Sequence, residues 1–186
     1  MLNSLLGTLS SGVAAATASF ESIASATGTG SSGVITFSSI PATYKHLQIR
    51  LIARCSESAA QTNYNMQING DTGSNYAYHN LRAVGAAVSA SGSASQTSIA
   101  VCAMAAANSP ANTVSPKIID IVDYASTTKN KTLRIIEGQV NATYGGQIHY
   151  RSGLWQSTSA ITSITLFVTG FNFTTQSTFA LYGIKG

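Results

Sequence analysis

The chain has 186 residues, of which 44% are hydrophobic and only 9% are charged. A disordered chain has the opposite balance, so this composition predicts one folded domain large enough to bury a core. Ten scattered bases against six acids give a net charge of +4 without a basic cluster, and no apolar run has the length of a membrane span, so we expect neither a nucleic-acid surface nor a transmembrane segment.

The first nineteen residues differ in pattern from the rest of the chain. Apolar side chains recur there at the spacing of one helical stripe, at Leu2, Leu5, Leu6, Leu9 and Val13. The first basic residue is Lys45, so the basic start of a secretory signal is missing. Gly7 and Gly12 weaken an isolated helix. We expect residues 1–19 to be a short apolar arm or helix. It either packs on its own domain or docks on a partner or a symmetry-related copy, and its weak intrinsic order favours docking.

From Phe20 onward the sequence has the pattern of strands and turns. Residues 20–26 and 34–38 alternate as the first two strands, and the segment between them, Gly28 to Gly33, matches GxGxxG. A dinucleotide site needs a helix after this motif, whereas a strand follows here. The interpretation favoured is therefore a hairpin connection.

Residues 45–54 are expected to form a long central strand of an antiparallel sheet. Leu47, Ile49 and Leu51 alternate with the polar Gln48 and Arg50, so one face is predicted to be buried and the other wet. Cys55 continues the same buried face, so we expect its thiol to be buried. Whether it pairs with the only other cysteine, Cys102, is left open by the sequence.

Further strands and turns follow to the end of the chain. Residues 64–68 lead into Asn69-Gly70, a hairpin signal; the single Asp71 beside it offers too little carboxylate for calcium. A small and polar stretch at 89–98 is predicted to be an exposed loop. Residues 117–124 are apolar on both faces, as expected inside a sandwich or at a subunit contact. About eight to ten strands predict an antiparallel β-sandwich or jelly roll over residues 20–186.

Catalytic and metal-binding patterns are not evident. The six acids are dispersed, the three histidines have no ligand spacing, and no GxSxG occurs, so we expect no enzyme activity, no cofactor and no metal. Aromatic rings in or beside polar turns are the stronger candidates for binding a sugar or a protein surface. These candidate contacts are Tyr76, Tyr78, Tyr144, Tyr150 and Trp155. For Trp155, packing between the sheets is the favoured alternative.

Several segments together resemble the small virion structural proteins of tailed bacteriophages, a group common among phages of marine bacteria and cyanobacteria. The matching segments are, in order, FESIA, ITFSSIP with YKHLQIR, NGDTGSNY, RSGLW with AITSI, and the terminal FALYGIKG. The likeness spans residues 20–186 and leaves the arm outside. It implies a compact jelly roll that acts as a homotrimer on the particle exterior, and it brings no catalytic residues.

Two functions follow from the resemblance together with the composition. The first is a homotrimeric capsid decoration (cement) protein that contacts the major capsid protein on the head exterior. The small size, the low charge and the apolar arm favour it, because a closed threefold would cover much apolar strand surface. The alternative is a tail-fibre or baseplate module that recognises host surface glycans through loop aromatics. A carbohydrate hydrolase ranks third.

Overall fold

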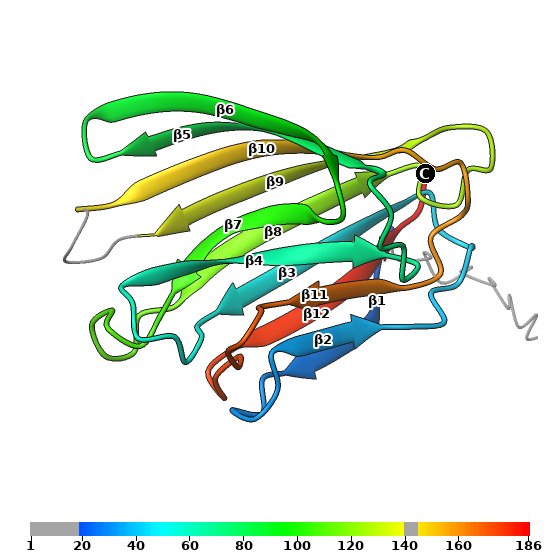
Figure 1. Ribbon diagram of the computed structural model, residues 1–186. Helices are drawn as coiled ribbons and strands as arrows, with labels where there is room; N and C mark the ends of the chain where they lie inside the picture. The colour runs from blue at the N-terminus through cyan, green and yellow to red at the C-terminus, as the bar shows by residue number, and fades with distance from the viewer. Residues whose placement is uncertain (1–18, 140–144) are drawn as a thin grey trace, which may run out of the picture.

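In the computed structural model, which describes residues 19–139 and 145–186, the chain forms two antiparallel β-sheets packed face to face (Figure 1). The described residues contain twelve strands and no helix. The predicted all-β sandwich is confirmed, with more strands than the eight to ten expected. The arm is outside the described residues, as is Tyr144.

The larger sheet has eight strands and the smaller has four, and every neighbouring pair is antiparallel. In spatial order the large sheet consists of β1 (Phe20–Thr27), β12 (Thr178–Ile184), β3 (His46–Ala53), β8 (Ser115–Val122), β9 (Lys131–Gln139), β10 (Gln147–Trp155), β5 (Tyr76–Val84) and β6 (Ala87–Gln96). The small sheet consists of β2 (Val34–Phe37), β11 (Ile164–Phe167), β4 (Gln61–Ile68) and β7 (Ile99–Ala105).

Strand β3 has the predicted alternation and lies in the interior of the large sheet, between β12 and β8. Leu47, Ile49 and Leu51 are buried against the small sheet, while Arg50 is exposed. Because side chains of a strand point alternately to its two faces, this register puts the odd-numbered apolar residues of β3 into the core and leaves Ile52 half-buried on the outer face. The prediction for the central strand is confirmed.

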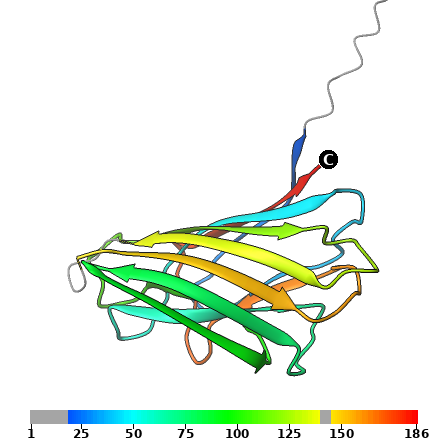
Figure 2. The same ribbon diagram turned by 90° about the horizontal axis from the view of Figure 1, so that it is seen from above.

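The large sheet continues well beyond the small one. Strand β7 is the last strand of the small sheet, and it packs against β8, β9, β10 and β5. Strand β6 forms the far edge, and most of its residues on both faces are exposed. At the opposite edge β1 pairs with β12, near the carboxyl terminus (Figure 2).

Two expected hairpins are instead crossings between the sheets. The Gly28–Gly33 segment joins β1 of the large sheet to β2 of the small one, because β1 pairs with the distant β12. The turn at Asn69-Gly70, where both residues have positive φ, likewise leads from β4 to β5 of the other sheet. The turn at Asn69-Gly70 is present as predicted, but a turn does not determine which strand its neighbours pair with.

The expectation of an exposed loop at 89–98 is also wrong, because most of this stretch belongs to β6. It pairs with β5 from Val84 opposite Ala87 to Tyr76 opposite Gln96. Serine and alanine alternate along it and carry no strong strand signal of their own. The backbone partner, which the composition cannot reveal, makes this segment a strand.

Four of the ten basic residues are buried, and two of them hold loops. The Arg54 guanidinium donates hydrogen bonds to the carbonyls of Ala107, Ser109, Pro110 and Thr113, at 2.9–3.1 Å. The Lys131 ammonium donates to the carbonyls of Ser126, Lys129 and Thr158. Such bonds satisfy loop carbonyls that burial would otherwise leave unpaired. The positive net charge therefore reflects cations used within the fold.

Both cysteines are buried, and both are free thiols. Cys55 is fully buried, as its place after β3 predicted. Cys102 lies in β7 at a β-bulge opposite Tyr64. The structure therefore decides against a disulfide between Cys55 and Cys102, which the sequence had left open.

Candidate interaction surface

The outer face of the large sheet, turned away from the small sheet, carries most of the exposed apolar side chains. Nine large apolar residues are exposed within the described part of the chain, and seven belong to this face. The seven are Leu81, Val88, Ile118, Val122, Ile136, Ile148 and Tyr150. Exposed apolar patches are typical of interaction sites, so this face is a candidate interaction surface.

Strand register arranges these side chains in rows across the sheet. One row runs from Ile118 on β8 through Ile136 and Tyr150 to Leu81 on β5. The next row, one step along the strands, contains Ile148 on β10 and, across Ala83, Val88 on β6. Ile148 is 63% exposed and Val88 is 70% exposed. We call these six residues the apolar rows.

A group of polar side chains on the outer face lies next to the row that contains Ile118 and Ile136, on the side away from Ile148. We call this group, which consists of Gln48, Arg50, Asp120 and Arg134, the polar row. The Arg50 guanidinium donates to the Gln48 side-chain oxygen, and the Gln48 amide donates to Asp120 at 2.7 Å. The second oxygen of Asp120 lies 3.7 Å from the Arg134 guanidinium. These groups satisfy one another on the surface, so they can enter a protein interface at a small desolvation cost.

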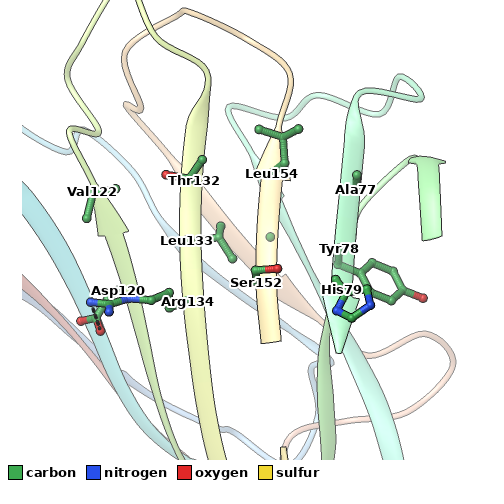
Figure 3. Close-up of a pocket in the computed structure, with 11 residues that line it drawn as sticks. Ala77, Tyr78, His79, Asp120, Val122, Thr132, Leu133, Arg134, Ser152 and Leu154 are labelled. Carbon is green, nitrogen blue, oxygen red and sulfur yellow. Dashed lines mark ion pairs between the residues drawn. The ribbon is translucent and has the colours of Figure 1, made fainter. Parts of the chain in front are cut away.

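Beyond the polar row the face contains a hollow of about 520 Å³ (Figure 3). Figure 3 shows Asp120 and Arg134 directed toward each other on one side, with Val122 and Leu154 at the opposite end. Small residues form the middle, among them Thr132 and Ser152. The hollow thus has a polar wall that is already paired and an apolar end.

The inner side of the same strands is unusually polar. On β10, Gln147, His149 and Arg151 point between the sheets and are buried, whereas Ile148 and Tyr150 point outward. The His149 ring lies 3.3 Å from the Asn80 side-chain oxygen, and the Arg151 guanidinium donates to a carbonyl of β7. Strand β10 is therefore inverted, with its polar side chains inside.

An ion pair lies at the centre of this buried polar cluster. Lys117 on β8 and Glu137 on β9 are cross-strand partners, their charged atoms are 3.3 Å apart, and both side chains are fully buried. Burial lowers the pKa of the Lys117 ammonium and raises the pKa of the Glu137 carboxyl, and each partner's charge opposes that shift. The Lys117 ammonium also lies 5.1 Å from the centre of the Tyr64 ring.

Burial shifts two other groups of the cluster toward their neutral forms. It lowers the pKa of His149 to about 4, with a smaller contribution from the Arg151 charge. It raises the pKa of the Cys102 thiol to about 12. A thiol of this pKa is unreactive at neutral pH, because the thiolate is the nucleophile. The geometry therefore assigns the cluster to the interior of the fold.

The aromatic residues predicted as contacts differ in their exposure. Tyr76 and Trp155 are buried, so the expectation of an exposed contact is wrong for Tyr76, whereas the favoured alternative of a packed ring is confirmed for Trp155. The Tyr76 hydroxyl hydrogen-bonds with the backbone of Ile68, and the Trp155 indole donates to Asp71 at 2.7 Å. Tyr78 is partly buried beneath the Arg151 guanidinium, 4.7 Å from it. Tyr150 alone of the four described rings is exposed, on the apolar rows.

The Asp71 carboxylate fastens the turn after β4. It accepts hydrogen bonds from Trp155, from the Asn75 amide and from the Gly73 backbone. These bonds lower its pKa, the Trp155 bond most of all. Its oxygens are thus occupied by protein donors. Within the described ranges no group of three His, Cys, Asp or Glu residues is placed to hold a metal ion.

The sequence prediction missed most of the apolar rows. It found that Ile118 and its strand neighbours are apolar on both faces, which the structure confirms for β8. It did not identify Ile136, Ile148, Leu81 or Val88. The sequence does show alternation on β10, but alternating apolar residues are by default assigned to the core and not to an exposed face. Only the pairing with β9 and β5 shows that they face outward.

Comparisons with known proteins give no match: no family model, no curated protein and no solved structure is similar to this chain. Among the described residues there is no helix long and apolar enough to cross a membrane.

Proposed function

We propose that this chain is a structural subunit of a bacteriophage particle, acting as a homotrimeric decoration protein on the head exterior. The observation that carries the proposal is the exposed apolar face of the large sheet. A sandwich that already has a complete core carries a second, unpartnered apolar surface, which is the expected property of a subunit that functions in an assembly. The resemblance to small virion proteins supports the choice of a phage particle.

We propose further that the sandwich is a jelly roll with two inserted hairpins. Without the pairs β5–β6 and β9–β10, eight strands remain in two sheets of four, β1-β12-β3-β8 and β2-β11-β4-β7. Such a pair of four-stranded sheets is the jelly-roll arrangement. Both inserted hairpins extend the large sheet on one side, and they carry most of the apolar rows.

The size of the outer face fits a contact between copies. With strands about 4.8 Å apart and about 3.3 Å of rise per residue, eight strands of about eight residues cover roughly 1,000 Å². A stable interface needs about 800 Å² from each partner. A second copy is the occupant that we favour, because the polar side chains of the row are hydrogen-bonded within their own chain and its two guanidinium groups and one carboxylate leave an excess of only one charge.

The test is the mass of the full chain in solution and of two lysine variants. Ile136→Lys places a charge in the centre of the apolar rows, and Thr36→Lys places one on the exposed face of the small sheet as the matched control. We expect light scattering to give three chain masses of 19.2 kDa each for the unaltered chain and the control, and one mass for Ile136→Lys. An unaltered chain that stays monomeric on concentration would contradict the proposal.

The position on the particle is tested by copy number. Quantitative mass spectrometry of purified particles should find far more copies than of any tail protein if the chain decorates the head. A copy number equal to that of a tail fibre would instead favour the alternative.

One observation favours a tail-fibre or baseplate module that recognises host glycans. The exposed ring of Tyr150 lies on the same face of β10 as Ser152, which faces His79 across the hollow floor. Aromatic faces beside hydroxyl and imidazole groups are suited to sugar rings. Calorimetry with host surface polysaccharide should then show binding that Tyr150→Ala removes, whereas a decoration protein should show none.

A further inference from the structure

The four outer strands of the two sheets differ in how their free edges are protected. An outer strand presents unpaired backbone groups, and folded proteins protect such edges by a short strand, a bulge, charged side chains or a covering segment. Strand β2 has only four residues, and β1 has a bulge at Ile23 and a charged side chain at Glu21. Strand β7 is almost wholly buried, and Lys117 and Arg151 of the large sheet donate hydrogen bonds to its carbonyls. Three of the four edges are therefore protected.

Strand β6 is the edge that lacks this protection. It is the longest of the described strands, with ten residues, and it contains neither a charged residue nor a proline. A bulge near Gln96 leaves seven consecutive regular pairs with β5, from Ala87 to Ser93. Within the described residues β6 pairs with no other strand (Figure 1). About half of the backbone groups in this run therefore point away from β5 without a partner, and such an edge can accept a further strand.

The charges of the β5–β6 hairpin permit two copies of β6 to lie side by side. Arg82 is the only Lys, Arg, Asp or Glu residue between Tyr76 and Gln96, and it belongs to β5. In an antiparallel pair of β6 strands, the two copies of β5 are three strand spacings apart, which is about 14 Å. Salt screens charges at this separation, because the Debye length is about 8 Å at physiological ionic strength. Self-pairing therefore brings little electrostatic repulsion.

Self-pairing also continues the apolar outer face. Val88 lies at the β6 end of one of the apolar rows, and Ala90 is opposite Leu81 at the end of the other. Both side chains are exposed. A twofold axis perpendicular to the sheet leaves the same face of both copies outward, so the apolar rows of one copy meet those of the other. The charge and the apolar face thus both favour a second copy as the occupant.

We propose that β6 pairs antiparallel with β6 of a second copy, with Ala90 on the twofold axis and two eight-stranded sheets joined into one of sixteen strands. This register uses all seven regular positions, and seven antiparallel pairs exchange about six to eight backbone hydrogen bonds. A typical protein interface has about ten. The contact joins chains in twos, so it links the trimers of the proposed function to one another and does not require them.

This contact is expected to be weak in dilute solution. Each backbone hydrogen bond replaces one with water and contributes little net free energy, and association costs translational and rotational freedom. Copies held close together on a particle surface avoid most of this cost, because their effective concentration is high. The pairing therefore forms on the particle or at millimolar chain concentration, whereas a variant without the threefold contact is monomeric at micromolar concentration.

Disulfide trapping in the full chain tests the pairing. One cysteine is introduced at Ala90, on the proposed axis, and in a control variant at Thr36, exposed on the small sheet; the native thiols are fully buried. In the Ile136→Lys background at about 1 mM, mild oxidation should link Ala90→Cys at least about tenfold faster than Thr36→Cys. Equal rates at the two positions would overturn the proposal. A fast link in this background supports it even where the chain fails to form trimers.

Charge exchange identifies the occupant of the edge. In the proposed register Ser89 of one copy is opposite Ser91 of the other, so replacing both serines by lysine, or both by glutamate, places like charges opposite one another and destabilises the pair. In the Ile136→Lys background at about 1 mM, light scattering should rise toward two chain masses. It should stay at one mass for each charged variant and rise again for their equimolar mixture.

A mixture that remains monomeric would overturn self-pairing. A background chain that stays monomeric at this concentration would overturn it as well, and would leave the β6 edge to a strand of another protein.

Discussion

Strands β3 and β10 belong to the same sheet and bury opposite kinds of side chain. On β3 the inward residues are Leu47, Ile49 and Leu51, and the outward ones include Gln48 and Arg50. On β10 the order is reversed, with polar residues buried and Ile148 and Tyr150 exposed. Both strands alternate with period two, so periodicity alone does not distinguish them.

The difference between β3 and β10 follows from what each strand faces on its inner side. Strand β3 faces a complete small sheet, so apolar burial stabilises its inner face. Strand β10 lies in the extension beyond β8, where its polar side chains meet Asn80 and Gln139 of neighbouring strands. These hydrogen bonds satisfy only part of the buried polar cluster, because the Arg151 Nε and Gln139 Nε2 atoms have no hydrogen-bond partner. The inversion leaves the apolar side chains of β10 on the exposed outer face.

The largest effect is expected from breaking the buried ion pair of the extension. Lys117→Met should lower the free energy of unfolding by about 3–5 kcal/mol, because it leaves the Glu137 carboxyl buried without its cation. Replacing Lys117 by Met and Glu137 by Leu together should recover most of the loss. Urea unfolding of the three proteins measures this. A double variant as unstable as the single one would show that the pair itself supplies the stability.

An isoleucine-to-alanine pair compares the two strands directly. Ile49→Ala on β3 should cost about 2–5 kcal/mol, since it opens a cavity in the core. Ile148→Ala on β10 should change the stability of the monomer by less than about 0.5 kcal/mol, because that side chain is mostly exposed. Equal losses in urea would mean that Ile148 is buried in the isolated chain.

His149 gives the inverted strand a distinct pH dependence. Its pKa in the folded chain, about 4, is below the ordinary 6.5, so the fold favours the neutral ring. This stabilisation is complete above pH 6.5 and is lost as the pH falls from 6.5 toward 4, by about 3 kcal/mol. Urea unfolding at pH 7 and pH 4.5 should show a smaller difference for His149→Gln. An unchanged difference would assign the acid sensitivity to other groups.

The smallest change in the free energy of unfolding is expected from a substitution in the polar row of the outer face. Arg134→Ala removes an exposed ion pair with Asp120 and should change stability by at most about 1 kcal/mol. If the outer face is the proposed contact between copies, Arg134→Ala should also weaken that contact, because Asp120 would be desolvated there without its partner. Dissociation of the oligomer on dilution should therefore respond more than urea unfolding does, and the reverse order would place this row outside the interface.

The sequence by itself determined the all-β class, the central strand at residues 45–54 and the buried state of Cys55. These features depend on local alternation and on turn chemistry, which act within a few residues. It also found that the strand containing Ile118 is apolar on both faces. It could not find strand β6, because a serine- and alanine-rich segment becomes a strand only through its pairing with β5.

Only the tertiary structure decided which face of each strand is inside. Trp155 and Tyr76 are buried because Asp71 and the backbone of Ile68 supply partners for their polar atoms. Ile148 is exposed because a register set by β9 and β5 points it away from the small sheet. Alternation specifies two faces but not their direction, and the direction is fixed by pairing between strands far apart in the sequence.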